Sequence, residues 1–243
     1  MSKLVLVAKG PGFDQAPSKG EVWGLGTYFM YRHCTMAFEA HDLSWSLSEC
    51  IRHVIFATGD MLTPREVYER GEWKYRLNKI KANYINKFNV PYMSIAKYDE
   101  NNPVQGVVVP SSIEYPLSDV LFSVLRGRNY LQGSFSFMLA YAIYLDKYDH
   151  IEVYGCDLAA KEEWAYQKPN VEYIWGIAEG RGIRMDIMTE SSLLTTPNDA
   201  IYGYLSTYKP IVPDDADLAD ELMIDRLGLV EGKRYGIQNN AEG

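Results

Sequence analysis

Five polar turns in this chain carry residue types that suit the binding of a phosphorylated ligand. The first follows an apolar run, residues 3–8, that breaks into Gly10-Pro11-Gly12. A glycine-rich turn after a strand presents backbone N–H groups to a phosphate, because no Cβ blocks its approach. The full spaced glycine fingerprint of dinucleotide-binding proteins is absent, so this turn needs support from the others.

The other four turns are Gly24–Thr27, Gly133–Ser136, Gly155–Asp157 and Glu190–Ser192. Ser134 and Ser136 stand where a helix begins, and they either cap that helix or donate to a phosphate. Asp157 follows a predicted strand, where an acid binds a ribose or a metal ion, or caps the next loop. Ligands of open α/β sheets bind at the carboxyl ends of the strands, so we expect these turns to form one site.

A dense polar segment, residues 162–170, opens a predicted helix. Lys168 is a candidate for holding the phosphate. Glu163 and Glu172 are candidates for the general base, because a positioned carboxylate can take a proton in group transfer.

Strands alternate with helices along the chain. The strands are predicted at 3–8, 21–25, 35–39, 90–95, 151–154 and 184–188, and the helices at about 46–53, 64–71, 74–88, 117–125, 134–147 and 170–180. The helix that begins at Ser134 is apolar nearly all round, which predicts that it is buried on the sheet. This order is typical of an α/β fold with a mainly parallel sheet and helices on both faces.

The chain has room for one large domain with an appendage, because it contains 243 residues, 47% of them hydrophobic. We expect a nucleotide-binding domain over 1–197 and a helical or irregular C-terminal extension over 198–243, with an acidic helix near 216–226. The extension can pack on its own domain or on a neighbouring subunit, which leaves monomer and homodimer open.

A net charge of −8 argues against a duplex DNA-binding protein, which needs a basic face. A basic segment over 74–87 has apolar residues at helical spacing, which predicts an amphipathic helix with a solvated basic face. The alternative is that this face binds single-stranded nucleic acid. No apolar run is long enough to span a membrane, and the start lacks the features of a signal peptide. The cysteines, Cys34, Cys50 and Cys156, fit no zinc or redox pattern, and reduced thiols predict a cytoplasmic protein.

A family resemblance rests on several segments in order. They are the first strand with Gly10-Pro11-Gly12, Glu21–Leu25, Gly133-Ser134, Ile151–Asp157, Tyr166–Glu172 and Gly180–Ile183. Together they resemble uncharacterised tailed-phage proteins with a Rossmann-like fold. More distantly they resemble bacterial sialyltransferases and the hydroxymethylpterin diphosphokinase-like family. The resemblance covers about residues 3–195 and implies a phage protein in the host cytoplasm.

The sialyltransferase resemblance places Gly10 and Pro11 near the phosphate of the donor, while Gly12 replaces a serine. An asparagine of that family corresponds to Gly26 here, so its contact is lost or passes to Thr27. The family's general base is a histidine, and the nearest position here is Tyr166, whose phenol is a poor base at neutral pH.

None of the four histidines, His33, His41, His53 and His150, lies in the loop where the sialyltransferases carry their base. His41 follows the third predicted strand. It either orients a ligand or has a purely structural role.

Three functions remain open. The first is a transferase, most plausibly a glycosyltransferase, that uses a nucleotide-activated donor held by Gly10, Gly12, Ser134 and Lys168. The second is Mg²⁺-dependent phosphoryl transfer of the diphosphokinase type, with Asp157 as a metal ligand and Lys9 as a cationic clamp. The third is a non-catalytic protein that sequesters a nucleotide or has a structural role.

Overall fold

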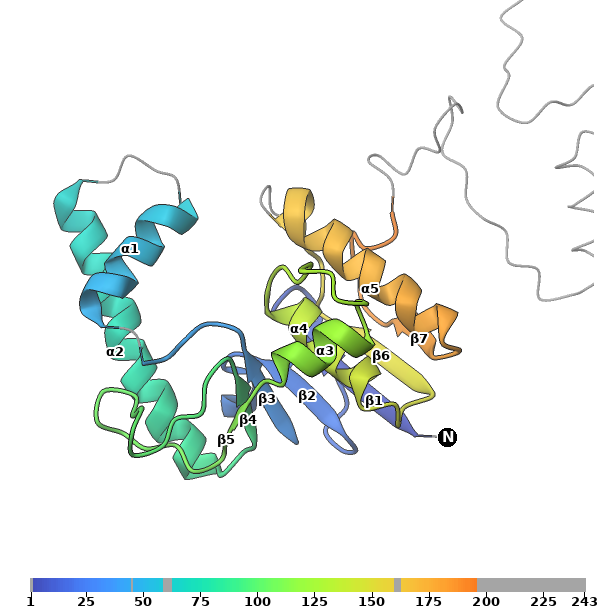
Figure 1. Cartoon of the computed structure of the whole chain (residues 1–243), viewed down its shortest axis with the longest axis horizontal. Helices are drawn as coiled ribbons and strands as arrows, with labels where there is room; N and C mark the ends of the chain where they lie inside the picture. The colour runs from blue at the N-terminus through green and yellow to red at the C-terminus, as the bar shows by residue number, and fades with distance from the viewer. Residues whose placement is uncertain (1, 45, 59–62, 160–162, 196–243) are drawn as a thin grey trace, which may run out of the picture. The chain divides into compact units, whose positions relative to one another are not determined.

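The structure is a computed structural model that describes residues 2–44, 46–58, 63–159 and 163–195. In the unit that ends at Leu193, seven strands form one sheet in the order β5-β4-β3-β2-β1-β6-β7. Every neighbouring pair is parallel, as Figure 1 shows. The predicted α/β, Rossmann-like fold is confirmed.

The strands are short and lie close to their predicted positions. They are β1 (Lys3–Val7), β2 (Val22–Leu25), β3 (Met36–Glu39), β4 (Tyr92–Ser94), β5 (Ser112–Glu114), β6 (His150–Tyr154) and β7 (Arg184–Ile187). Strand β5 was not predicted. It has three residues at the edge of the sheet, and only Ser112 is buried, so it carries no apolar pattern.

Five helices and three short helical turns connect the strands. The helices are α1 (Leu47–Thr58), α2 (Pro64–Phe88), α3 (Leu117–Ser123), α4 (Ser134–Tyr144) and α5 (Lys168–Gly180). The 3₁₀ turns are η1 (Phe13–Gln15) and η2 (Tyr28–Met30), and a π-helical turn, η3 (Glu163–Gln167), leads into α5.

The prediction of two helices over 64–71 and 74–88 is wrong, because α2 is continuous. A capping box between Thr63 and Glu66 begins it. Gly71 lies inside it, where a Cβ would overlap the Ile51 side chain of α1. This glycine therefore allows α1 and α2 to approach closely and does not end the helix.

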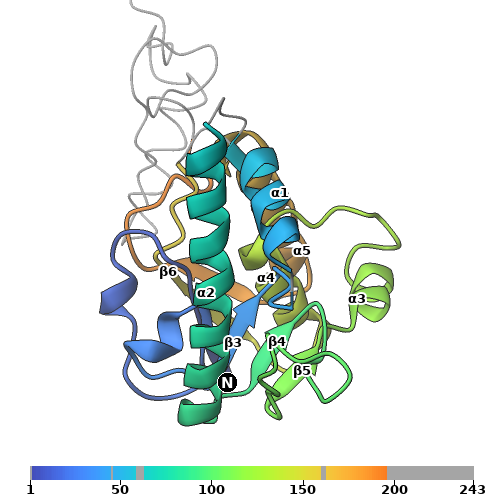
Figure 2. The same cartoon turned by 90° about the vertical axis from the view of Figure 1, so that its left-hand side faces the viewer.

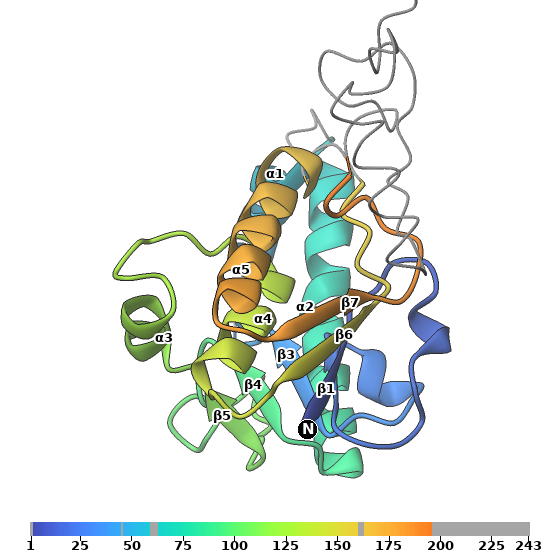
Figure 3. The ribbon, with the colours of Figure 1, turned by 90° about the vertical axis from the view of Figure 1, so that its right-hand side faces the viewer.

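Helical elements cover both faces of the sheet, as Figures 2 and 3 show. Leu4 and Leu6 of β1 belong to the cluster that includes α4 and α5, whereas Val5 and Val7 face the segment with η1 and η2. The alternation follows from the two-residue period of a strand. Further along the sheet, α2 packs its Ala82 and Ile85 on the second face.

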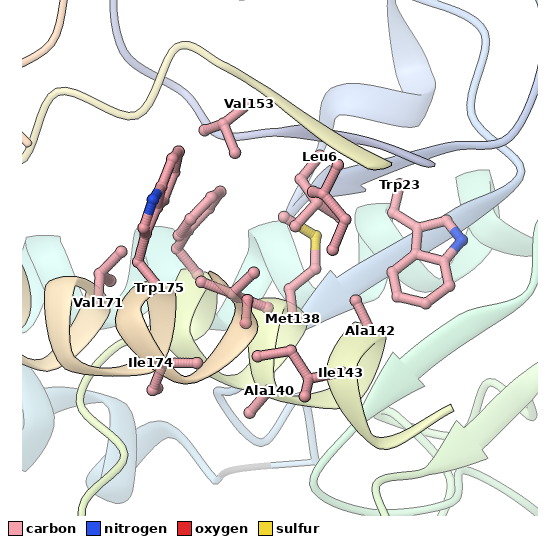
Figure 4. Close-up of a cluster of buried hydrophobic side chains, with 14 of the residues drawn as sticks. Leu6, Trp23, Met138, Ala140, Ala142, Ile143, Val153, Val171, Ile174 and Trp175 are labelled. Carbon is pink, nitrogen blue, oxygen red and sulfur yellow. The ribbon is translucent and has the colours of Figure 1, made fainter. Parts of the chain in front are cut away.

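The main core lies between the sheet and helices α4 and α5 (Figure 4). Trp23 of β2 stacks on Phe38 of β3, with ring centroids 5.3 Å apart. Met138, Leu139 and Ile143 of α4 are fully buried beneath the strands. The predicted burial of α4 is confirmed, and it fixes the start of this helix against the sheet.

The predicted C-terminal extension over 198–243 and its acidic helix lie outside the described residues, and the boundary at 197 stays a prediction. Among the helices that the structure describes, none combines the length and the apolar character needed to cross a membrane.

Replacing Leu139 tests the importance of the α4 contact. Leu139→Ala is expected to lower the free energy of unfolding by about 2–5 kcal/mol, because it leaves a cavity in a packed core. Leu117→Ala is the control, since this leucine is 45% exposed at the start of α3. Urea unfolding of the full chain measures both, and equal losses would contradict the assignment of the core.

Candidate functional site

A cleft of about 550 Å³ lies at the carboxyl edge of the sheet. Its lining comes from the ends of β1, β2 and β6, the loop after β3, the start of α4 and the turn η3. The lining residues are Ala8–Pro11, Leu25, Gly26, His41, Gly133–Phe135, Gly155–Ala159, Glu163 and Gln167. The chain builds β2 to β5 on one side of β1 and then β6 and β7 on the other, so the cleft lies at the topological switch point, where such folds bind ligands.

The turns after β1 and β6 pack directly on each other. The Gly10 N–H donates to the Gly155 carbonyl at 2.6 Å, and a Cβ on Gly10 would lie 2.6 Å from the same oxygen. Glycine at position 10 therefore allows the two turns to share the floor of the cleft. Pro11 also lines the cleft, as predicted from the first turn.

Gly12 lies beyond the cleft lining. Its backbone is left-handed, with φ at +79°, and a Cβ there would lie 2.6 Å from the Thr189 methyl group. A side chain is excluded by both the conformation and the neighbour. The structure thus gives a packing reason for glycine where the family resemblance suggested a serine.

The first turn of α4 forms one wall of the cleft through Gly133, Ser134 and Phe135. The N–H groups of a first helical turn have no acceptor within the helix and point out of its end. The Ser134 hydroxyl accepts from the Ala40 N–H at 3.2 Å, which ties the loop after β3 to α4. The Ser136 N–H is engaged by the Gly133 carbonyl at 3.2 Å, so the backbone donors that this wall can offer are those of Ser134 and Phe135.

Ser136 has a structural role in this arrangement. It is fully buried, and its hydroxyl lies 2.8 Å from the Gln132 carbonyl and 2.7 Å from the Gly133 carbonyl, which share its single proton as acceptors. It closes the turn before α4 and is absent from the cleft lining, in contrast to its predicted contact with a nucleotide.

The opposite side of the cleft carries two acids, Asp157 and Glu163. The Ser192 N–H donates to Asp157 Oδ1 at 3.0 Å, which orients this carboxylate after β6. Cys156, between the β6 turn and Asp157, is buried, and burial raises the pKa of its thiol, so it stays protonated at neutral pH. This side offers acceptors for hydroxyl groups or for a cation.

Lys9 supplies a positive charge on the β1 side. The residue is exposed as a whole, but its ammonium group rests on the turn after β2, where a Cβ at Gly26 would overlap Nζ. Burial of this group lowers the pKa of Lys9, while the nearby Glu39 carboxylate raises it and Lys81 lowers it further. Gly26, the position that corresponds to the family's asparagine, therefore leaves the space that this ammonium group occupies.

Lys9, Glu39, His41 and Lys81 form a charged cluster. Lys9 and His41 line the cleft, whereas Glu39 and Lys81 are buried. Lys81 of α2 donates to Glu39 Oε2 at 2.9 Å, and both side chains are more than nine-tenths buried. His41 Nδ1 lies 2.6 Å from Glu39 Oε1. Two ammonium groups stand against one carboxylate, so the cluster carries an excess of positive charge.

The charge of Glu39 is fixed by its neighbours. Burial raises the pKa of this carboxyl, but the hydrogen bond from His41 and the charges of Lys81 and Lys9 outweigh it, and the pKa lies well below its usual range. Glu39 is therefore ionised under all conditions near neutral pH.

Several predicted site residues are not brought to the cleft. Thr27 is the residue directly before η2 and does not line the cleft, whereas its neighbour Gly26 does. Tyr166 is 68% exposed and also lies outside the lining. Lys168 is buried and lies 3.6 Å from Glu172, with which it forms an ion pair. Among the predicted base candidates, Glu163 is the one that lines the cleft.

The cleft contains residues that the predicted site set omitted. Gln167 packs on Gly133, and His41 and Lys9 face the cleft from the loop after β3 and the end of β1. Lys9 was considered only for phosphoryl transfer, and His41 was expected either to orient a ligand or to have a structural role. The signals available in the sequence were a charged residue, Lys9, directly after the first predicted strand and a histidine two positions after the third.

The buried pair can be tested by removing one charge or both. Glu39→Gln is expected to lower the free energy of unfolding by about 3–5 kcal/mol, because it leaves the Lys81 ammonium buried without its carboxylate. The double variant Glu39→Gln/Lys81→Met is expected to lose much less than the sum of the two single losses. Urea unfolding at pH 7 measures this, and additive losses would contradict a direct interaction.

The same pair predicts a pH dependence. The pKa of Glu39 is lower in the folded state than its ordinary value near 4.5, so the folded chain binds fewer protons. The stability difference between wild type and Glu39→Gln is expected to be constant above about pH 5 and to shrink as the pH falls below the ordinary value. A difference that grows in acid would contradict this assignment.

No family model and no curated protein matches this chain, so the resemblance to phage proteins stays a prediction. Among solved structures, the chain is similar to the sialyltransferase CstII from Campylobacter jejuni, in complex with a substrate analogue, cytidine-5'-monophosphate. The match covers 92% of this chain and 99% of that chain, with 12% sequence identity and a TM-score of 0.39. At this distance, no ligand and no residue role passes from that enzyme to this chain.

Proposed function

We propose that this protein binds a nucleotide or a nucleotide-sugar in the cleft and acts as a transferase of the glycosyltransferase type. The observation that carries the proposal is the convergence of the Lys9 ammonium group and the first turn of α4 on one cleft at the switch point of the sheet. A cation and helix N-terminal amides together are a suitable set of donors for a phosphate.

The distribution of charge supports one orientation of the ligand. The phosphate would lie beside Lys9, Gly10 and Ser134, where the charged cluster is positive. The ribose hydroxyls would then face Asp157 and Glu163, whose carboxylates accept hydrogen bonds. The volume of the cleft, about 550 Å³, supports a ligand larger than a free phosphate.

The sequence also left Mg²⁺-dependent phosphoryl transfer open. Mg²⁺ is commonly held by one or two carboxylates together with substrate phosphates, and Asp157 and Glu163 would be the ligands in this cleft. Among the described residues, no group of three or more acids, histidines or cysteines is placed to hold a metal ion. No feature of the structure favours this reaction over glycosyl transfer. The binding test below therefore includes phosphoryl transfer as an alternative outcome.

A cytoplasmic location and a separate extension over 198–243 belong to the same proposal. The support for the location is that none of the three cysteines, all of them among the described residues, forms a disulfide.

Binding can be tested by thermal shift with nucleoside monophosphates and nucleotide-sugars, each with and without Mg²⁺. A ligand that binds the folded chain raises its melting temperature in proportion to the logarithm of its concentration above Kd. We expect a nucleoside monophosphate, and also the nucleotide-sugar that contains the same nucleotide, to stabilise the chain without Mg²⁺. Stabilisation only by ATP with Mg²⁺ would favour phosphoryl transfer, and no shift at millimolar ligand would contradict the proposal.

The place of the phosphate can be tested at Lys9 and Gly26. Lys9→Met is expected to weaken binding by about 10- to 100-fold, the loss typical of one charge-assisted hydrogen bond. Gly26→Ala is expected to do the same by displacing the ammonium group. Gly106→Ala is the matched control, since its φ is also positive, at +81°, with nothing within 4 Å of the added Cβ. Equal binding by Gly26→Ala and Gly106→Ala would place the phosphate elsewhere.

A further inference from the structure

Helix α2 presents one face to solvent along its C-terminal half. On its inner side, Ala82 and Ile85 are buried in the core that they share with β3 and β4. In Figure 2, α2 lies in the foreground. The exposed residues on the opposite side recur at helical spacing and are here called the outer face of α2: Arg76, Lys79, Ile80, Asn83, Tyr84 and Lys87. This face extends for about 17 Å, since an α-helix rises 1.5 Å per residue.

The outer face carries positive charge with little to compensate it. Residues 73–89 contain five lysine or arginine residues and no acid, and one of the five is the lysine of the buried pair described above. Arg76 pairs with Glu72 on the surface, and a surface ion pair is weak enough to exchange for another anion. Among the ion pairs that the structure describes, none involves Lys79 or Lys87. The face therefore offers cations to a negatively charged partner.

Two aromatic rings lie exposed at the C-terminal end of this face. Tyr84 and Phe88 are 36% and 48% exposed, and their rings are nearly parallel, with centroids 6.1 Å apart. The buried ring of Phe29 meets Phe88 edge-on at 6.1 Å and supports it from the protein side. Lys87 Nζ lies 5.6 Å from the centroid of the Tyr84 ring and 5.9 Å from that of Phe88. Exposed rings and an ammonium group thus occupy one place on the surface.

Rings and cations together suit an unpaired nucleic-acid strand. Aromatic side chains stack on bases of any sequence, while lysine and arginine follow the phosphates. In a duplex the faces of the bases are covered by their neighbours, so only a strand with unpaired bases can use the rings. An acidic protein would pair with the lysines and leave the rings unused. The net charge of −8 opposes a polyanion at long range, so we expect modest affinity that falls as salt is added.

We propose that the outer face of α2 binds single-stranded nucleic acid, with bases stacked on Tyr84 and Phe88. The phosphates lie against Lys79, Lys87 and Arg76. This inference does not depend on the proposed transferase function, because none of these five residues lines the cleft.

Binding is tested by fluorescence anisotropy of the full chain with labelled oligothymidine and oligouridine of about 15 nucleotides, enough to cover one site. The strands carry no terminal phosphate, and the two sugars separate DNA from RNA as the natural ligand. We expect binding at least about fivefold tighter than that of a duplex of the same length. The logarithm of the affinity should fall with the logarithm of the salt concentration at a slope of about −1.4 to −2, for two or three phosphates. No binding of either strand at low salt, or equal binding of the duplex, would overturn the inference.

The stacking contact is tested at Tyr84. Tyr84→Ala is expected to weaken binding by about 5- to 100-fold, the range found for loss of one base–aromatic contact. Tyr84→Phe keeps the ring and should bind within about twofold of the wild-type chain. Tyr68→Ala is the matched control, because Tyr68 lies on the same helix and is 49% exposed, but has Glu66 and Glu69 beside it in the sequence. Urea unfolding checks that each variant is folded. Equal losses in Tyr84→Ala and Tyr68→Ala would overturn the inference.

The phosphate contact is tested at Lys87. Lys87→Gln is expected to weaken binding by about 3- to 10-fold and to make the salt slope shallower by about 0.7, the share of one phosphate. Lys147→Gln is the matched control. The Lys147 ammonium group also lies over a ring, 4.7 Å from the centroid of Tyr148, but that tyrosine is buried and cannot stack on a base. An unchanged salt slope in Lys87→Gln would contradict the contact.

Three further outcomes would overturn the inference by assigning the face or the strand elsewhere. If Lys87→Gln weakens binding and Tyr84→Ala does not, the face is a basic surface for any polyanion. If Lys9→Met abolishes binding and Tyr84→Ala does not, the strand lies in the cleft. If no strand binds and the chain self-associates unless Tyr84 is replaced, the face is a contact between two copies. Failure of nucleotides to bind in the thermal-shift test overturns the proposed function and leaves this inference standing.

Discussion

The buried ion pair between Glu39 and Lys81 is the interaction on which the arrangement of the cleft depends. It joins the end of β3, near the middle of the sheet, to α2 on one face. A buried pair of this kind adds little net stability, because desolvation of both groups offsets their attraction. The pair matters because it fixes the position of the Glu39 carboxylate. This carboxylate also contacts His41 and raises the pKa of Lys9, at the edge where the strands end.

The two sides of the cleft differ in charge because they come from different parts of the chain. Residues before 42 supply the cationic side, and residues after 156 supply the acids, while α4 contributes backbone amides between them. An extended ligand with a phosphate at one end and hydroxyl groups at the other suits this division. Close packing of the Gly10 and Gly155 turns holds the two sides together, since neither turn leaves room for a side chain at the contact.

The sequence predicts the sheet well, because buried parallel strands are continuous apolar runs and α4 is apolar all round. It misses β5, whose three residues have no such pattern, and it divides α2 at Gly71, whose role depends on contact with Ile51. Of the predicted residues that line the cleft, Gly10, Pro11 and Asp157 follow from the rule that ligands bind where strands end, Ser134 from its place at a helix start and Glu163 from the polar segment before α5.

The remaining parts of the site depend on distances in space that no local pattern encodes. Lys168 belongs to the polar segment that leads into α5, but its side chain is buried and forms an ion pair with Glu172. Lys81 is 42 residues from Glu39 in the chain. The most direct measurement of the central claim is a crystal structure of the full chain with a bound nucleoside monophosphate. The account predicts the phosphate within about 3 Å of Lys9 Nζ and the first-turn amides of α4, with the ribose toward Asp157. A phosphate bound on the Asp157 side, or outside the cleft, would contradict it.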